Sequence, residues 1–428
     1  MESESYSHGA QVYAAGWVGG ITPKEPAVLG GSIRPLPPTD AVVEPIEVDV
    51  IALRDHLGEE VILVSFDLLY VGKHLRRAVE EAFSHVSPVR ILTAATHTHR
   101  APMTDASKPL LGATSEAYIA QVEEVLIAIA AKHRTGGESL RRSHLHFSRV
   151  EVHLAINRRR FRRFTIGRRP SVNSVVMAPN PKGFVRDELL VCVWRTSSGK
   201  PTAVLWNYAC HPVAHPSGNS VAAHFPHIVR QRLRRHYKDP NLPVVYLQGF
   251  SGNVRPLASA RSSGFMGRLA RLLKGPMFSD MTQSAYHSWS GSLAEEVLLA
   301  TQDALPQLAA PLFVCRNSVA AVNFVNGGSA PVTFQAARLT PRLVIAGVSA
   351  EVVAEYVPII ESLFPGEDLI LVGCLDDTFG YAPTSEQLSE GGYEAGGYCA
   401  TFGLRAVSPS IEKALVAGFT SVLEGLRK

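Results

Sequence analysis

The sequence predicts an α/β protein with a mixed β-sheet core flanked by helices. Two apolar, β-branched runs at 44–53 and 59–71 are separated by a turn-like stretch, which predicts two neighbouring strands. Residues 73–86 then place apolar side chains at helical spacing, and residues 89–102 read as a strand that runs into a polar loop. This alternation of strand, helix and strand is typical of an α/β fold.

The same patterns continue to the end of the chain. Further strands are predicted at 143–157, 188–196, 201–212, 243–250, 343–351 and 369–377. Further helices are predicted at 115–133, 225–237, 292–305, 352–364 and 410–423. Stretches without a clear period are expected to be irregular, namely an extended lead-in at 1–45, a basic loop at 157–183, a connection at 258–290 and a Gly- and Tyr-rich loop at 378–403. No linker or internal repeat divides the chain, so residues 1–428 are expected to form one domain.

The composition is that of a globular protein of enzyme size. With 428 residues and 46% hydrophobic content, the chain can bury a large core. Its 42 basic and 38 acidic residues nearly balance, so the net charge of +4 does not indicate nucleic acid as a partner. The five cysteines show no CxxC pair, which argues against a disulfide framework or a cysteine zinc site. Without a signal-peptide pattern or a long apolar run, we expect a cytoplasmic protein with no stable membrane insertion.

Side chains that bind metals or transfer protons follow four of the predicted strands. The four segments are THTH at 96–99, NYACHP at 207–212, QGFSGN at 248–253 and SAE at 349–351. In α/β proteins, ligands bind outside the carboxyl ends of the strands. We therefore expect these four loops to meet.

The residue types in these loops favour a metal site. His97 and His99 lie two positions apart, so on an extended segment they project to one side, where one can bind a metal and the other a substrate oxygen. A single histidine is more often an ordinary hydrogen-bonded residue. A further histidine, His211, and a glutamate, Glu351, at other strand ends shift the balance, because two histidines and a glutamate are a common ligand set of catalytic zinc. Zinc would activate a water molecule and polarise a carbonyl group.

Five short segments occur along the chain in a fixed order. They are TAATHTHRAP at 93–102, AVLWNYACHPVAHPSGN at 203–219, YLQGFSGNVRP at 246–256, GVSAE at 347–351 and GYAPTSEQLSEGGYE at 380–394. Together they resemble the neutral/alkaline (non-lysosomal) ceramidase family and its shorter bacterial relatives. The resemblance runs from about residue 10 to the end of the chain and implies a ceramidase-like catalytic domain. It leaves no segment for the immunoglobulin-like domain that follows in full ceramidases.

The resemblance also implies roles for individual residues. His97, His211 and Glu351 match the family's zinc ligands, which implies about one zinc ion per chain at this site. His99 matches a second active-site histidine, and Arg158 matches an arginine that faces the substrate. The arginines that follow, at 159–169, are expected to belong to a solvated basic loop.

A further zinc ligand of the family, a tyrosine, aligns with Leu388 in this chain. Either zinc keeps three protein ligands here, or Tyr393 or Tyr398 reaches in from the same loop. Tyr381, at the start of that segment, is expected to contact the substrate.

Other departures from the family's pattern concern the substrate. Asn253 and Arg255 stand where ceramidases place an acid and a serine, and His224 replaces an acid. The small residues after THTH have become Arg100-Ala-Pro-Met103. If Asn253, Arg255 and His224 contact the substrate, they favour one with a carboxylate, phosphate or other anionic oxygen over neutral ceramide.

The resulting hypothesis is a zinc amidohydrolase that cleaves a linear N-acyl amide of a small, polar or anionic metabolite. His99 and Arg158 would stabilise the oxyanion, while Tyr393 or an imidazole protonates the leaving amine. Two alternatives remain: a zinc esterase, lactonase or deacetylase, and a non-catalytic binding protein that kept the fold. Because the sequence contains no GxSxG, GxGxxG or P-loop motif, serine hydrolase and nucleotide chemistry are not supported. The only partner expected is a small-molecule substrate, and the sequence does not indicate an oligomeric state.

Overall fold

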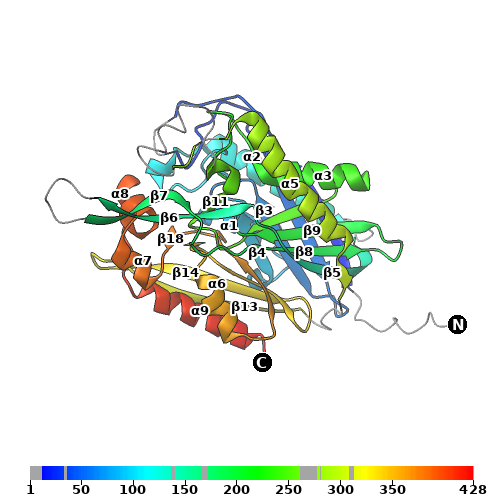
Figure 1. The fold of residues 1–428 in the computed structure, drawn as a ribbon. Coiled ribbons are helices and arrows are strands. Elements are labelled where there is room, and N and C mark those ends of the chain that lie inside the picture. The colour runs from blue at the N-terminus through cyan, green and yellow to red at the C-terminus, as the bar shows by residue number, and fades with distance from the viewer. Residues whose placement is uncertain are drawn as a thin grey trace.

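The computed structural model describes residues 12–32, 36–135, 140–164, 172–260, 277–279, 281–307 and 313–427. Two β-sheets pack face to face in the centre of the molecule, and helices cover their outer faces (Figure 1). The predicted α/β fold with a mixed sheet core flanked by helices is confirmed.

The larger sheet has the strand order β10-β9-β8-β5-β1-β2-β3-β4, and a short strand, β12, also pairs with β5. Its strands are β1 (Val12–Gly20), β2 (Glu47–Arg54), β3 (Glu60–Phe66), β4 (Ile91–Ala95), β5 (Arg141–Glu151), β8 (Glu188–Arg195), β9 (Pro201–Tyr208), β10 (Val244–Gln248) and β12 (Leu305–Pro306). The pairs β3–β4 and β9–β10 are parallel, whereas the remaining pairs are antiparallel. Every residue of β3, β4 and β10 is buried, as expected for strands that are covered on both faces.

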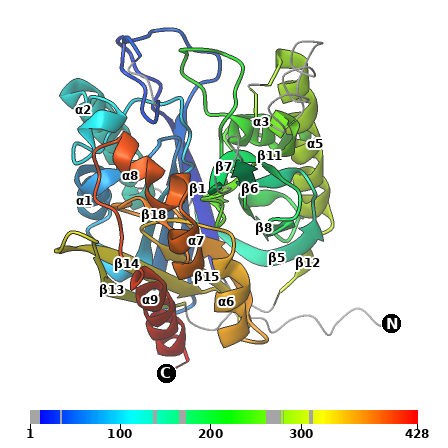
Figure 2. The ribbon, with the colours of Figure 1, turned by 60° about the vertical axis from the view of Figure 1, so that its left-hand side comes forward.

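Two pairs of helices cover the outer face of this sheet. The helices α1 (Gly72–Ala82) and α2 (Glu116–Thr135) share a core with β2 and β3, and α3 (Phe225–Tyr237) and α5 (Gln283–Gln302) share one with β8, β9 and β10. Figure 2 shows the two pairs on opposite sides of β1. Within the described residues, no helix is long and apolar enough to cross a membrane.

The smaller sheet lies against the inner face of the larger one. It consists of β13 (Val314–Asn323), β14 (Ser329–Arg338), β15 (Leu343–Val348) and β17 (Asp368–Val372). Its outer face packs on α6 (Tyr356–Leu363) and α9 (Ile411–Gly425). The molecule therefore has four layers, in the order helices, sheet, sheet, helices.

Short elements gather at the carboxyl ends of β4, β9 and β15. They are β6 (Ala155–Phe164), β7 (Val172–Asn180), β11 (Val254–Pro256), β16 (Glu351–Val352), β18 (Tyr381–Ala382), α7 (Ser385–Glu390), the π-helical turn η4 (Tyr393–Gly397) and α8 (Tyr398–Thr401). Three 3₁₀ turns, η1 (Pro88–Arg90), η2 (Pro109–Leu111) and η3 (Leu257–Ala260), complete the described elements.

Three of the irregular stretches were predicted wrongly. Within the expected lead-in, Val12–Gly20 is a central strand of the larger sheet. Its glycines suggested turns, but packing requires them, because a Cβ on Gly16 would lie 2.4 Å from the Pro243 side chain and one on Gly19 would lie 2.3 Å from Val125.

The basic stretch 157–183 is largely the β6–β7 hairpin, and 378–403 contains β18 and three short helical segments. The arginines of β6 hid its strand pattern because two of them, Arg158 and Arg159, are buried in ion pairs. In the second stretch, Thr384 and Gln387 form a capping box that starts α7, and this sequence signal was missed. The connection expected at 258–290 lies mostly outside the described residues, and its last part, from Gln283, is already helical.

Candidate metal centre and active site

His97 follows β4 in a strained backbone conformation. Its φ angle is 67°, a left-handed value that residues other than glycine rarely adopt, so the segment is not extended as the sequence suggested. The Nδ1 atom of His97 lies 2.9 Å from the carbonyl oxygen of Leu69. If Nδ1 donates this hydrogen bond, the lone pair of Nε2 points away from the carbonyl and into the site.

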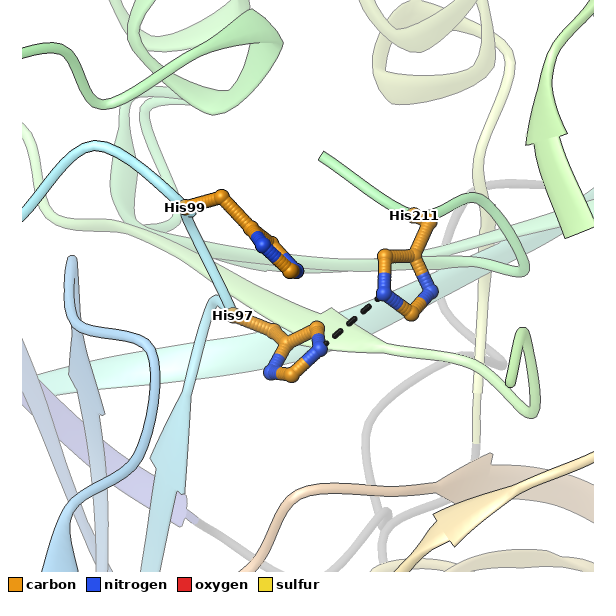
Figure 3. A group of neighbouring side chains, drawn as sticks. All are labelled: His97, His99 and His211. Carbon is orange, nitrogen blue, oxygen red and sulfur yellow. Dashed lines mark hydrogen bonds between the residues drawn. The ribbon is translucent and has the colours of Figure 1, made fainter. Parts of the chain in front are cut away.

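His211 follows β9 and is held in the same way. Its Nδ1 atom lies 3.1 Å from the carbonyl oxygen of Ser251, in the loop after β10. The two Nε2 atoms face each other, with 3.1 Å between those of His97 and His211 (Figure 3). Metal-ligating histidines commonly donate the other ring N–H to a backbone carbonyl, as both do here.

Glu351 brings a carboxylate to the same point from the loop after β15. Its Oε2 atom lies 3.1 Å from Nε2 of His97 and 3.8 Å from Nε2 of His211. All three side chains are at most 2% exposed. The expected convergence of these three residues is therefore present in the structure.

These three donor atoms fit a divalent metal ion. Two imidazole lone pairs cannot face each other at 3.1 Å unless a proton or a metal ion lies between them. Within the described part of the chain, Oε2 of Glu351 forms no hydrogen bond, so it is also available as a ligand. Zinc bonds of about 2.0–2.1 Å in a tetrahedron place ligand atoms about 3.3 Å apart, close to the observed separations.

The electrostatics of Glu351 and His211 agree with this assignment. Burial lowers the pKa of His97, but Cys374 and Glu351 raise it well above its ordinary value, so a metal ion here would displace a proton from His97. Burial alone would raise the pKa of Glu351, but the neighbouring His97 and the Tyr70 hydroxyl hold it at about 2. Burial lowers the pKa of His211 well below its ordinary value, and the charge of His97 lowers it further. A carboxylate and a neutral imidazole are the forms in which these groups bind metals.

Tyrosines surround the carboxylate of Glu351. The Tyr70 hydroxyl donates a hydrogen bond to Oε1 of Glu351, and the Tyr398 hydroxyl lies 3.0 Å from that of Tyr70. Tyr381 is the strand partner of Glu351 in the β16–β18 pair, and its hydroxyl helps to lower the pKa of Glu351. Leu388 instead packs into the apolar core under α6 and α9. The phenols beside the candidate metal ligands are therefore Tyr70, Tyr381 and Tyr398, and position 388 does not contribute one.

His99 lies against both candidate metal ligands, His97 and His211. Its ring centre is 5.0 Å from that of His97 and 5.3 Å from that of His211 (Figure 3). Nδ1 lies 3.3 Å from the carbonyl oxygen of Gly31, and Nε2 is buried without a partner among the described residues. Burial and the charge of His97 lower the pKa of His99 to about 3. A neutral ring with a free Nε2 can act as a proton acceptor or as a further ligand, since its ligand atom lies within 4.8 Å of those of the other two.

Arg158 is buried beside the tyrosines, as expected for an active-site residue. Its Nε atom donates to Glu394 at 2.7 Å, and one terminal nitrogen donates to the Gly252 carbonyl at 2.7 Å and to the Tyr381 hydroxyl at 2.9 Å. Its guanidinium carbon lies 5.5 Å from the centre of the Tyr393 ring. These contacts fix the orientation of Tyr381 and leave its O–H to donate elsewhere.

Arg159, expected in a solvated loop, is instead buried. It forms ion pairs with Glu394 at 3.0 Å and with Glu390 at 3.0 Å. It therefore links β6 to α7 and to η4, which begins with Tyr393.

Besides Tyr381, three further residues were expected to contact the substrate, and their surroundings differ. Asn253 donates to both carboxylate oxygens of Glu355, at 2.7 and 2.9 Å, and accepts a hydrogen bond from the Ala354 N–H. Its amide therefore positions the chain after Glu351 and does not make the expected substrate contact. Arg255 contacts Met177 and the Phe278 ring.

His224 is 1% exposed, with φ of 61° and with neither ring nitrogen hydrogen-bonded among the described residues. Burial lowers its pKa well below the ordinary value, to which the charges of His215 and Arg100 add.

Several residues of the site were missed in the sequence. Tyr70 lies in the loop after β3, which ends at Phe66. The predicted strand extended to residue 71, so Tyr70 was not recognised as a loop residue at the end of a fifth strand. Glu394 lies in η4, where an irregular loop was expected. Tyr398, which the sequence offered as a possible zinc ligand, lies in α8, and its hydroxyl contacts that of Tyr70. No local pattern marks the Leu69 and Ser251 carbonyls, because their role depends only on backbone position.

The comparison with solved structures identifies the fold. No protein-family model matches the chain, and no curated protein matches it by sequence. The structure is similar to that of the neutral ceramidase from Pseudomonas aeruginosa, with a TM-score of 0.75, 12% sequence identity, and coverage of 98% of this chain and 75% of that chain. The chain has the fold of a neutral ceramidase. A structure described as a ceramidase complexed with C2 gives a TM-score of 0.74 with the same identity and coverage. The ceramidase-like fold implied by the sequence motifs is thus confirmed.

Proposed function

We propose that this protein is a zinc-dependent amidohydrolase that cleaves the N-acyl amide bond of a small polar or anionic metabolite. The observation that carries the proposal is the convergence of His97, His211 and Glu351 from three strand ends, within 3.8 Å of one another, in the fold of a ceramidase. Zinc held by these residues would lower the pKa of a bound water to about 7 and polarise the amide carbonyl.

His99 is the residue best placed to transfer a proton. Its Nε2 is unpaired among the described residues and lies beside both metal-ligating histidines. With Nδ1 donating to Gly31, Nε2 accepts the proton of the attacking water and passes it to the leaving amine. The sequence suggested that His99 stabilises the oxyanion, and that role stays a prediction. An unprotonated Nε2 can also accept a proton, although the low pKa of His99, about 3, makes it a weak base before zinc and substrate are bound.

Tyr381 and Tyr393 supply hydroxyl groups to the reacting carbonyl in this proposal. Arg158 donates to Tyr381, and its charge is compensated by Glu394. Arg158 therefore positions the hydroxyl of Tyr381, and direct contact of Arg158 with the oxyanion is not required.

The test of this function uses zinc-loaded protein and matched pairs of N-acyl amides and esters. We expect hydrolysis of amides, and in His99→Ala a loss of about 10²–10⁴-fold in kcat without loss of zinc. Hydrolysis of the esters alone would instead identify an esterase, lactonase or deacetylase. Binding of both substrate types without turnover would identify a non-catalytic relative.

The proposed substrate charge is tested separately. Arg255 lies on β11, next to β6, and Arg100 lies close enough to His224 to lower its pKa, so two arginines bring positive charge to the surroundings of the site. His224 itself is neutral there because its pKa is lowered. We expect N-acyl substrates with a carboxylate to react faster than matched neutral ones. Arg255→Ser should lower kcat/KM for the anionic substrate by about tenfold or more, the effect of one charge-assisted contact. Full activity of that variant on the anionic substrate would show that Arg255 only stabilises the contact with Met177 and Phe278.

A further inference from the structure

A second cluster of metal-binding side chains lies at the opposite end of β3. Glu60 is the first residue of this strand, His133 lies in the last turn of α2, and His85 follows α1. Oε2 of Glu60 is 3.0 Å from Nε2 of His133 and 3.7 Å from Nε2 of His85. One ligand atom from each of the three lies within 4.8 Å of the others. The length of β3 separates this cluster from Leu69 and the metal centre by on the order of 20 Å.

Two of these side chains are buried and carry polar atoms without a hydrogen-bond partner among the described residues. Glu60 is 7% exposed and His133 is 6% exposed. Among the residues that the structure describes, neither Oε2 of Glu60 nor either ring nitrogen of His133 forms a hydrogen bond of acceptable geometry, although they lie close together. Leaving such atoms unsatisfied costs free energy, which a bound cation at this point would recover.

Arg54 orients the carboxylate of Glu60. It lies opposite Glu60 in the β2–β3 pair, and its Nε donates to Oε1 of Glu60 at 2.7 Å. The other oxygen, Oε2, is thereby directed to the imidazoles. This is the arrangement in which a neighbouring residue holds one carboxylate oxygen while the other binds a metal.

The cluster is accessible from solvent. A cavity of about 360 Å³ is lined by Arg54, Glu59, Glu60, His85 and Arg90, among others. The His85 side chain is 39% exposed, and its ring stacks on that of His133 with 5.0 Å between centres and 29° between planes. Two ligands are therefore fixed in the interior, and the third can turn to meet an incoming ion.

We propose that Glu60, His85 and His133 form a second zinc site, which links β3 to the ends of α1 and α2. Two imidazoles and one carboxylate suit zinc better than calcium or magnesium, which prefer oxygen ligands. The separations of 3.0 and 3.7 Å bracket the roughly 3.3 Å expected between zinc ligands, and a rotation of His85 brings its Nε2 into line. The proposal does not depend on the function of the first site.

The competing explanation is an ion pair between Glu60 and a protonated His133. Arg54 and Arg90 add positive charge, which disfavours a cation, but Arg90 is paired with Glu59 at 3.2 Å. A simple ion pair would not require His85. The contribution of His85 therefore distinguishes the two explanations.

The experiment uses the full chain with His97→Ala and His211→Ala, which removes two ligands of the first site. Circular dichroism establishes that this variant is folded, and zinc is then titrated against a chromophoric chelator. We expect one zinc equivalent to remain and to raise the Tm. Adding His85→Ala should weaken zinc binding at least tenfold, whereas His74→Ala, which removes an exposed histidine of α1 paired with Glu123, should leave it unchanged.

A single substitution provides an independent measurement if the double variant does not fold. His85→Ala in the otherwise native chain should lower the bound zinc by one equivalent and leave hydrolysis unchanged. Absence of a zinc equivalent that depends on His85, in either background, overturns the proposal and leaves the Glu60–His133 ion pair.

Discussion

At the scale of single residues, backbone strain and buried polar atoms without hydrogen bonds coincide at the candidate metal centre. His97 and His224 both have left-handed φ angles, of 67° and 61°, each of which costs roughly 1–3 kcal/mol in a residue other than glycine. Nε2 of His99 and Oε2 of Glu351 are buried without hydrogen bonds among the described residues. Natural folds retain such costs where binding offsets them, so these atoms are expected to meet a metal ion or a substrate.

The first prediction concerns zinc stoichiometry. Replacing His97 or His211 by Ala removes one of three ligands, so either variant should contain one zinc equivalent fewer than the wild type. Elemental analysis of dialysed protein measures this difference. An unchanged zinc content in the His97→Ala, His211→Ala double variant would remove the proposed metal centre.

The second prediction concerns the hydrogen bond that Tyr70 donates to Glu351. Tyr70→Phe keeps all three metal ligands but frees Oε1 of Glu351, so zinc affinity should fall about 10–100-fold. Competition with a chelator measures the affinity. Tyr118→Phe is the matched control, because this hydroxyl is also buried but forms no hydrogen bond among the described residues. Equal affinities in the two variants would contradict the role of Tyr70.

At the scale of elements, the site is assembled by loops that hydrogen-bond to one another rather than by any one motif. Gly30 and Gly31 donate to the carbonyls of Ala101 and Leu111, which fastens the segment after β1 to the loop that follows His99. The pairing of β16 with β18 positions Glu351, and Asn253 ties the chain after Glu351 to β11. Each functional side chain is thus held by a segment distant in sequence.

The third prediction tests the packing of Gly31 on His99. Gly31 has φ of 80°, and a Cβ there would lie 2.6 Å from Nδ1 of His99. Gly31→Ala should therefore displace His99 and lower kcat at least tenfold. Gly58→Ala is the control, because Gly58 also has a positive φ, 89°, but a Cβ there would lie in open space. This substitution therefore has only the backbone cost, about 1 kcal/mol. Comparable activity of the two variants in the amide assay would argue against a catalytic position for His99.

At the scale of the whole molecule, a buried charge network joins α3 to the larger sheet. Arg230 contacts Glu47 at 2.9 Å and pairs with Asp67, and Arg234 contacts Glu47 at 2.7 Å. Asp67 also accepts a hydrogen bond from Thr96, the residue before His97. The network therefore connects the stability of the fold to the position of the metal loop.

The fourth prediction follows from the pKa of Glu47. Burial would raise it, but Arg230 and Arg234 lower it from an ordinary value of 4.5 to about 2. A carboxyl whose pKa is lower in the folded state stabilises the fold above its unfolded pKa, and this stabilisation is lost as the pH falls. Between about pH 5 and pH 3, the wild type should lose roughly 2 kcal/mol of unfolding free energy that Glu47→Gln does not lose. Urea denaturation at both pH values measures this difference, and Glu116→Gln, at an exposed position, is the control. Equal losses of unfolding free energy in all three proteins would exclude a stabilising role of ionised Glu47.

The sequence by itself determined the fold class and the three metal-ligand candidates. In an α/β protein nearly every strand is buried between layers, so its apolar residues are visible in the sequence. The loops that follow these strands meet at one edge of the sheet, so reactive residues in them can be grouped. Both signals are local, so they could be read for His97, His211 and Glu351 without knowing how the strands are ordered.

Only the tertiary structure decided how those residues are supported. Val12–Gly20 and Ala155–Phe164 form strands because distant partners accommodate their glycines and neutralise their arginines, which local composition does not reveal. Asn253 had chemistry suited to a substrate, but its amide is used by Glu355 and Ala354. Tyr70, Glu394 and the carbonyls of Leu69 and Ser251 act through hydrogen bonds to residues 28 to 281 positions away, and such contacts exist only once the chain has folded.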